Sequence, residues 1–305
     1  MTGVSHSQRL ANGTVISICS HFNIDTMKLS LMVFKMEGTN AFKRQKIAEI
    51  PQSRTSMQHA FAITTEYAII FDPPWYIDFD VFGMFFRDRQ LLDLIKNDLH
   101  GTTKIHVVRL RDGEVTTLDS KKWSLILHFS NSYQLDEDTI VVEGPAYEKP
   151  DDNPFKIFTS ENMNCADNLI QKERGSVYKK FILNLKDKTV SHEPLIATQW
   201  GAFDFPSYNP KWNGVAKHRY TYLFQLMHQA DYDEDYKWPI HKYDDEQKKI
   251  VATFGPSKTL GQEPRFIANP ESNDEEDGLI ISTFFNYQEK TSTIYIIDPK
   301  TMTAL

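Results

Sequence analysis

The amino-acid sequence predicts an all-β protein. Short apolar runs, and runs that alternate apolar with polar residues, recur along the chain, which is the pattern of buried and half-buried strands. Clusters of turn-forming residues such as Arg111-Asp-Gly113 separate them. Aromatic residues make up 12% of the 305 residues, which favours an ordered core over a disordered chain. Many short strands at steady intervals are typical of a sandwich, a barrel or a propeller.

The predicted elements follow one another without a clear break. The strand pattern occurs at residues 14–19, 29–36, 67–71, 104–110, 123–129, 139–143, 178–185, 220–226, 249–254, 278–285 and 292–298. Segment 87–99 predicts a helix instead, because Leu91, Leu94, Ile95 and Leu99 recur near helical spacing and Gly101 follows as a stop signal. The polar segment 147–153 and the acidic segment 274–277 are predicted loops. No linker rich in Gly, Ser or Pro divides the chain, so we expect a single domain over residues 1–305.

Composition and short motifs exclude several classes of function. The net charge of −7 argues against a nucleic-acid partner, which requires a basic surface. The two cysteines, Cys19 and Cys165, show no metal-type spacing and suit a reducing compartment. Neither a signal peptide nor a run of about 18 apolar residues is visible. We therefore expect a cytoplasmic protein, soluble or peripherally attached to a membrane. Phosphate-binding loops, G-x-S-x-G and H-E-x-x-H are absent from the sequence.

Two histidines stand at or beside predicted strands. His59 begins the segment His-Ala-Phe-Ala-Ile-Thr-Thr-Glu-Tyr-Ala-Ile, and His128 begins His-Phe-Ser-Asn-Ser-Tyr. A His held at a strand end on a rigid sheet can aim its imidazole at a shared point, as a multi-histidine metal site requires. A strand-end His taken alone is usually structural, so the flanking residues carry the functional interpretation.

The flanking residues resemble signatures of the carotenoid cleavage oxygenases. The His59 segment is similar to H-x-F-x-(I/L)-T-x-x-Y-x-(I/V), and the His128 segment is similar to H-x-x-N-x-(Y/W). Further matches to the family occur in the same order as in its members, at residues 6–14, 203–210 with 218–222, 261–267, 275–282 and 295–298. The resemblance therefore extends along nearly the whole chain.

The resemblance implies a seven-bladed β-propeller with Fe(II) on its axis, held by four histidines. Three of them would be His6, His59 and His128, and the fourth would follow Leu305. The family's N-terminal portion, which supplies a closing blade and an outer Glu, is also missing here. We therefore expect an incomplete propeller, an internal piece of a longer enzyme. Imidazoles also suit zinc and copper, so the identity of the ion comes from the family alone.

Acidic side chains outside the ligands are expected to accept the outer ring N–H groups and fix the histidine tautomers. By resemblance, Asp204 and Glu275 are the candidates for this role. Asp204 replaces the Glu that is more frequent in the family and is shorter by one methylene. Gln134 likewise replaces an acidic residue common after the N-x-Y element.

The segment 73–86 is unusually aromatic. The alternatives are core packing and a patch that lines an apolar tunnel and contacts a membrane, as the matching region of the family does. The patch would comprise Trp75, Phe82, Met84, Phe85 and Phe86.

By resemblance, the expected reaction is oxidative cleavage of a conjugated double bond in a carotenoid or apocarotenoid by O₂, giving aldehyde or ketone products such as retinal. Two alternatives stay open. One is a retinoid isomerohydrolase of the same family, which uses the same ligands for ester cleavage. The other is an inactive truncated fragment that acts only as a binding module.

Overall fold

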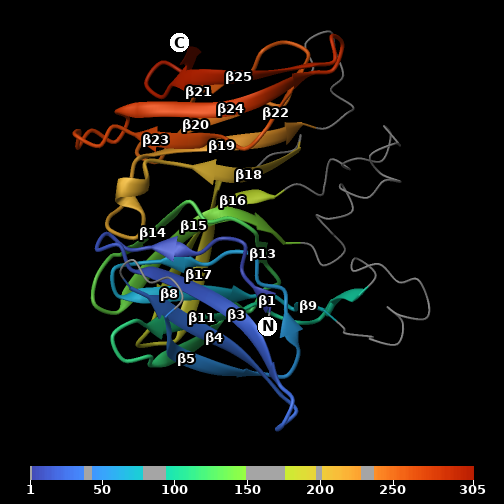
Figure 1. Cartoon of the computed structure of the whole chain (residues 1–305), viewed down its shortest axis with the longest axis vertical. Coiled ribbons are helices and arrows are strands. Elements are labelled where there is room, and N and C mark those ends of the chain that lie inside the picture. Colours follow the sequence, from blue (N-terminus) through green and yellow to red (C-terminus); the bar gives the residue numbers. More distant parts are fainter. Residues whose placement is uncertain (1, 38–42, 78–93, 149–175, 197–200, 228–236) are drawn as a thin grey trace.

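A computed structural model describes residues 2–37, 43–77, 94–148, 176–196, 201–227 and 237–305. The prediction of an all-β protein is confirmed: the described residues form strands joined by turns and loops, with one short 3-10 helix, η4 (Pro210–Trp212), and no α-helix. The strands form six antiparallel sheets, here called A to F (Figure 1).

The first three sheets contain the N-terminal strands. Sheet A consists of β1 (Thr2–Gly3), β2 (Gln8–Arg9), β3 (Val15–Asn23), β4 (Lys28–Met36) and β5 (Arg44–Gln52). The small sheet B consists of β6 (Thr55–Ser56), β9 (Trp75–Ile77) and β10 (Ile95–Asn97). Sheet C consists of β7 (Ala62–Ile63), β8 (Tyr67–Asp72), β11 (Lys104–Arg109) and β12 (Val115–Asp119).

The remaining sheets follow in chain order. Sheet D consists of β13 (Leu125–Ile126), β14 (Asn131–Gln134), β15 (Thr139–Tyr147), β16 (Val177–Asn184) and β17 (Thr189–Ile196). Sheet E consists of β18 (Gly201–Ser207), β19 (Tyr220–Met227), β20 (Ile240–Asp244) and β21 (Lys249–Phe254). Sheet F consists of β22 (Thr259–Gly261), β23 (Arg265–Ala268), β24 (Gly278–Asn286), β25 (Thr291–Asp298) and β26 (Thr303–Ala304).

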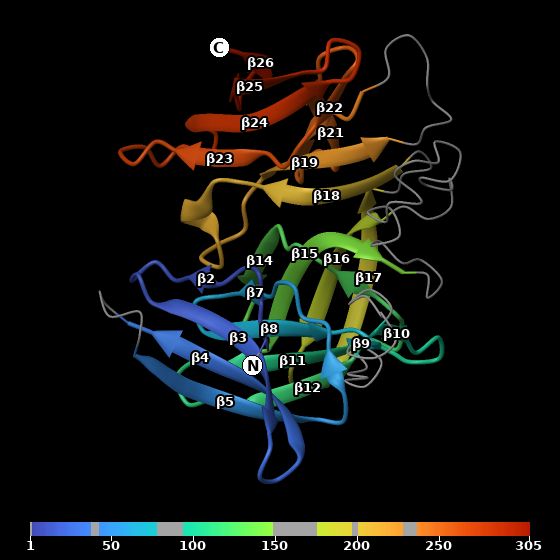
Figure 2. The same cartoon turned by 45° about the vertical axis from the view of Figure 1, so that its right-hand side comes forward.

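Successive large sheets pack face to face. Aliphatic side chains join sheet A to sheet C and sheet C to sheet D, and aromatic side chains dominate the contacts of D with E and of E with F. Figure 2 shows the resulting stack, with β4 and β5 at one end and β24 and β25 at the other. Branched and aromatic residues alternate with polar ones along these strands, so one face of each can be buried against a neighbouring sheet. The single domain over 1–305 and the number of blades stay predictions.

The predicted helix at 87–99 is wrong in its described part. Ile95–Asn97 form β10, which pairs with β9 of sheet B, and residues 87–93 lie outside the described residues. Leucines spaced for a helix do not decide the structure here, because pairing with an adjacent strand overrides local propensity. Among the residues that the structure describes, no helix has the length and hydropathy needed to cross a membrane.

A buried ionic cluster lies between sheets D and E. Lys180 Nζ is 3.2 Å from Glu143 Oε1 and 3.6 Å from Asp245 Oδ1, and Lys217 Nζ is 2.5 Å from Asp245 Oδ2. Burial, reinforced by Asp245, raises the pKa of Glu143 from 4.5 to about 7, although Lys180 acts in the opposite direction. The folded protein therefore favours the protonated carboxyl group.

Glu143→Gln is expected to remove a pH-dependent penalty on folding. Because the pKa of Glu143 is higher in the folded than in the unfolded chain, its contribution to stability falls as pH rises from about 4.5 to 7. The loss amounts to about 3 kcal/mol, at 1.4 kcal/mol per pKa unit. Denaturant unfolding at pH 5 and pH 8 should show Glu143→Gln gaining stability relative to the wild type at pH 8. The exposed Glu193, which lies opposite Lys180 on the neighbouring strand β17, gives the control Glu193→Gln, from which no gain like that of Glu143→Gln is expected at pH 8.

Candidate metal centre

The three predicted histidines come together at one end of sheets A, C and D. Each stands two or three residues before a short edge strand: His6 before β2, His59 before β7 and His128 before β14. A backbone hydrogen bond from Ser5 N–H to the carbonyl of His59, 3.0 Å long, joins the first two segments. The three histidines are dozens of residues apart in the sequence. They meet because sheets A, C and D each place the segment before a short edge strand on the same side of the molecule.

The three imidazoles form a nearly symmetrical cluster. Their ring centroids lie 5.0 Å (His6–His59), 5.0 Å (His6–His128) and 4.9 Å (His59–His128) apart. One nitrogen from each ring lies within 4.8 Å of the others. His59 Nε2 and His128 Nε2 are 3.2 Å apart. Two nitrogens that share one metal at about 2.1 Å each, at an angle of roughly 90–109°, are separated by about 3.0–3.4 Å, so this donor set fits a single ion.

The Asp204 carboxylate contacts one of these rings. Its Oδ1 accepts a hydrogen bond of 2.8 Å from His128 Nδ1–H, and its Oδ2 accepts one of 3.2 Å from the hydroxyl of Tyr147. A proton on Nδ1 leaves the lone pair of His128 Nε2 directed at the other two histidines. At 3% exposure the Asp204 carboxylate needs such donors, and both come from described, largely buried side chains.

Burial and mutual repulsion favour the neutral form of two of these histidines, His59 and His6. The pKa of His59 falls to about 4, chiefly through burial and then through the neighbouring His128 and His6. The pKa of His6 is also lowered, first by burial and then by His128. Neutral imidazoles are the form that binds a metal ion, so the site holds two of its donors in the binding state at neutral pH.

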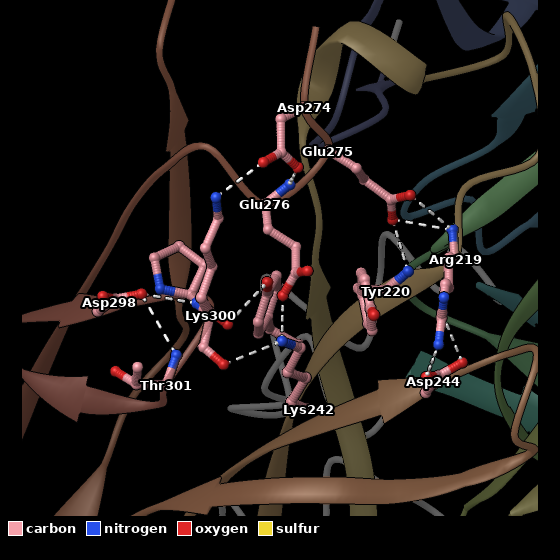
Figure 3. Close-up of polar contacts among 12 residues, drawn as sticks. Arg219, Tyr220, Lys242, Asp244, Asp274, Glu275, Glu276, Asp298, Lys300 and Thr301 are labelled. Carbon is pink, nitrogen blue, oxygen red and sulfur yellow. Dashed lines mark hydrogen bonds and ion pairs between the residues drawn. The ribbon is translucent and has the colours of Figure 1, made fainter. Parts of the chain in front are cut away.

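The prediction that Glu275 contacts a ligand histidine is wrong. Figure 3 shows its carboxylate directed at the backbone where β19 begins, accepting from Arg219 N–H at 2.8 and 3.0 Å and from Tyr220 N–H at 2.5 Å. Arg219 in turn donates to Asp244 at 2.7 and 3.0 Å. Glu275 lies in the predicted acidic loop and fastens that loop to sheet E, because two adjacent backbone N–H groups satisfy its half-buried carboxylate.

The aromatic patch is only partly described. Trp75 is 1% exposed and packs edge-to-face on Trp123, with ring centroids 6.3 Å apart. It is therefore packed in the core, which is one of the two alternatives for this segment, and it is not exposed to a membrane. Phe82, Met84, Phe85 and Phe86 lie outside the described residues.

The sequence did not single out three further residues around the cluster. Ser5 Oγ lies 3.3 Å from His59 Nδ1, and Tyr147 supports Asp204 from behind. Glu263 stands before β23 as the histidines stand before their strands, and it lines a cavity of about 280 Å³ together with His6 and His128. Only Glu263 had a sequence signal, the Gly-Gln-Glu-Pro match. Ser5 and Tyr147 are recognisable only in the folded protein, because the residues they contact, His59 and Asp204, are distant in the sequence.

The comparisons with known proteins agree with the motifs. Residues 2–305 match the model of the retinal pigment epithelial membrane protein (RPE65) family. The chain is 27% identical over 327 residues to the carotenoid 9,10(9',10')-cleavage dioxygenase 1 of Arabidopsis thaliana, covering 99% of the chain and 55% of that protein. It is 26% identical over 269 residues to the enzyme of the same name from Pisum sativum, covering 81% of the chain and 45% of that protein.

Solved structures share the fold. A cobalt-substituted apocarotenoid oxygenase (ACO) from Synechocystis superposes with a TM-score of 0.76 at 19% identity, and an ACO/RPE65 chimera with a TM-score of 0.75 at 18% identity. Each covers 99% of this chain and 60% of the solved chain. The chain thus spans about half the length of the curated relatives it matches, and it belongs to the RPE65 family, the carotenoid oxygenases that its motifs indicated.

Proposed function

We propose that the protein binds Fe(II) through His6, His59 and His128 and cleaves a conjugated double bond of a carotenoid or apocarotenoid with O₂. The reaction adds one oxygen atom of O₂ to each carbon of the double bond, so two carbonyl products form and no other oxidant is needed. The observation that carries the proposal is the near-symmetrical cluster of three imidazoles, with two Nε2 atoms 3.2 Å apart.

The residues of this chain would bind and orient the ion. Three uncharged donors leave the positive charge of the ion uncompensated, and the Asp204 carboxylate behind His128 offsets part of it. Fe(II) supplies the redox chemistry toward O₂ when bound. The 280 Å³ cavity reaches His6 and His128 and gives small molecules access to the site. The apolar substrate, O₂, a peripheral membrane contact and the cytoplasmic location all belong to the proposal.

The test is made on the full 305-residue chain. The protein is loaded anaerobically with Fe(II), freed of excess metal and supplied with an apocarotenoid aldehyde in detergent under ¹⁸O₂. We expect one iron per chain, loss of polyene absorbance and a shorter aldehyde that carries ¹⁸O. Bound iron with an unchanged polyene would contradict the proposed reaction, and absence of bound iron would contradict the metal site itself. Cleavage of a retinyl ester without consumption of O₂ would support the isomerohydrolase instead.

A further inference from the structure

Phe205 has a backbone conformation that is costly for its residue type. Eight described non-glycine residues have a positive φ, and seven of them stand in turns or bends and have unbranched Met or Lys side chains. The eighth is Phe205, with φ of 49°, in the middle of strand β18. Left-handed φ in a bulky residue is an outlier, and such strain is frequent at functional sites.

The strained residue sits in a β-bulge beside the metal centre. Asp204 pairs with Phe224 and Ser207 pairs with Tyr222, so β18 contains one residue more than β19 over this stretch. Bulges with a left-handed residue usually place Gly there, since Gly has no Cβ to clash. An aromatic residue at this point therefore implies that its ring contributes something that Gly would not.

Phe205 contacts the Asp204–His128 pair in two ways. Its backbone N–H donates to Asp204 Oδ1 at 2.8 Å, the same oxygen that accepts from His128 Nδ1. The centroid of its ring lies 4.7 Å from that of the His128 ring, with an angle of 36° between the ring planes, and 5.9 Å from that of the Phe224 ring. The left-handed turn thus aims the carboxylate at His128, while the ring covers the imidazole.

We propose that Phe205 is a positioning residue for the metal centre: its strained backbone directs Asp204 toward His128, and its ring holds the His128 imidazole in place and shields the hydrogen bond between them from water. The inference rests on the proposed metal site. Metal binding should therefore depend on an aromatic ring at position 205, and not on the stability of β18.

Three substitutions separate the ring from the backbone. Phe205→Tyr keeps the ring, Phe205→Ala removes it, and Phe205→Gly removes it and also relieves the positive φ. Met27→Gly is the control, because Met27 has a φ of 51° in an exposed hairpin turn remote from the histidines. Each full-length variant is examined for melting temperature, for Co²⁺ affinity and visible spectrum, and for hydrogen exchange of the His128 Nδ1–H by ¹⁵N-histidine NMR without metal.

We expect Phe205→Gly to melt above Phe205→Ala, as Met27→Gly should melt at or above the wild type. Despite that gain, Phe205→Gly should bind Co²⁺ about 10- to 100-fold more weakly, with an altered spectrum and faster exchange at His128. Phe205→Tyr should restore wild-type values. If wild-type protein does not bind Co²⁺, the metal site fails and the NMR measurement alone decides the role of Phe205. The inference would be overturned if Phe205→Gly bound Co²⁺ with wild-type affinity and exchanged the His128 Nδ1–H at the wild-type rate. If no Co²⁺ binds to the wild type, an unchanged exchange rate in Phe205→Gly alone would overturn it.

Discussion

The His128→Ala variant is expected to lose bound metal and activity together. His128 is one of only three described donors in the cluster, and its Nε2 lies 3.2 Å from His59 Nε2. Removing it leaves two donors and takes away the histidine that donates to the buried Asp204 carboxylate, so the loss of affinity should exceed the roughly 10- to 100-fold typical of a lost outer partner. Isothermal titration with Fe(II) or Co²⁺ measures the effect.

His59→Ala should behave in the same way, while His100→Ala should bind metal like the wild type. His100 is exposed in a turn and lies outside the cluster, so it controls for the general effect of removing an imidazole. Metal retained with wild-type affinity in His128→Ala would show that the cluster is structural.

Asp204→Asn is expected to leave the fold intact and to weaken metal binding by roughly 10- to 100-fold. The amide is isosteric with the carboxylate but lacks its charge, so it supports the Nδ1–H of His128 less strongly and no longer offsets the charge of the ion. Metal titration measures the effect on metal affinity, and the melting temperature of the metal-free protein measures the effect on the stability of the fold.

The matched control is Glu275→Gln. Glu275 is a half-buried carboxylate with two backbone donors, and it was predicted for the same role as Asp204, yet its partners are Arg219 and Tyr220. Glu275→Gln should leave metal affinity unchanged, because its carboxylate binds the backbone N–H groups of Arg219 and Tyr220. Equal metal affinities for Asp204→Asn and the wild type would assign Asp204 a purely structural role.

The sequence predicted those parts of the site that depend on local motifs. His59 and His128 are recognisable because each is followed by a strand whose residue pattern is specific, and Asp204 because the segment around it resembles a family motif. Contacts between distant segments were not predictable in this way. Tyr147 reaches Asp204 across 57 positions, and Ser5 reaches His59 across 54, through the stacking of sheets that no local pattern encodes.

The errors have the same origin. Glu275 carries a motif match, but a loop of consecutive acidic residues does not reveal which of them turns inward or toward which neighbour. The strand β17 was not predicted, because it lies at the edge of sheet D and most of its residues are exposed or half-buried. It also contains Pro194, which interrupts the alternation of apolar and polar residues. Segment 95–97 was assigned to a helix from the spacing of its apolar residues. Its actual partner, β9, lies about 20 residues upstream, so the local pattern does not reveal the pairing.

The most direct test of the metal centre is X-ray absorption spectroscopy on the iron-loaded 305-residue chain. We predict at least three nitrogen scatterers at about 2.1 Å with the outer-shell features of imidazole rings, as for other histidine-ligated metals. The His128→Ala variant, if it retains iron at all, should show a smaller imidazole contribution. A first shell of oxygen or sulfur without imidazole features would contradict the assignment of His6, His59 and His128 as the ligands.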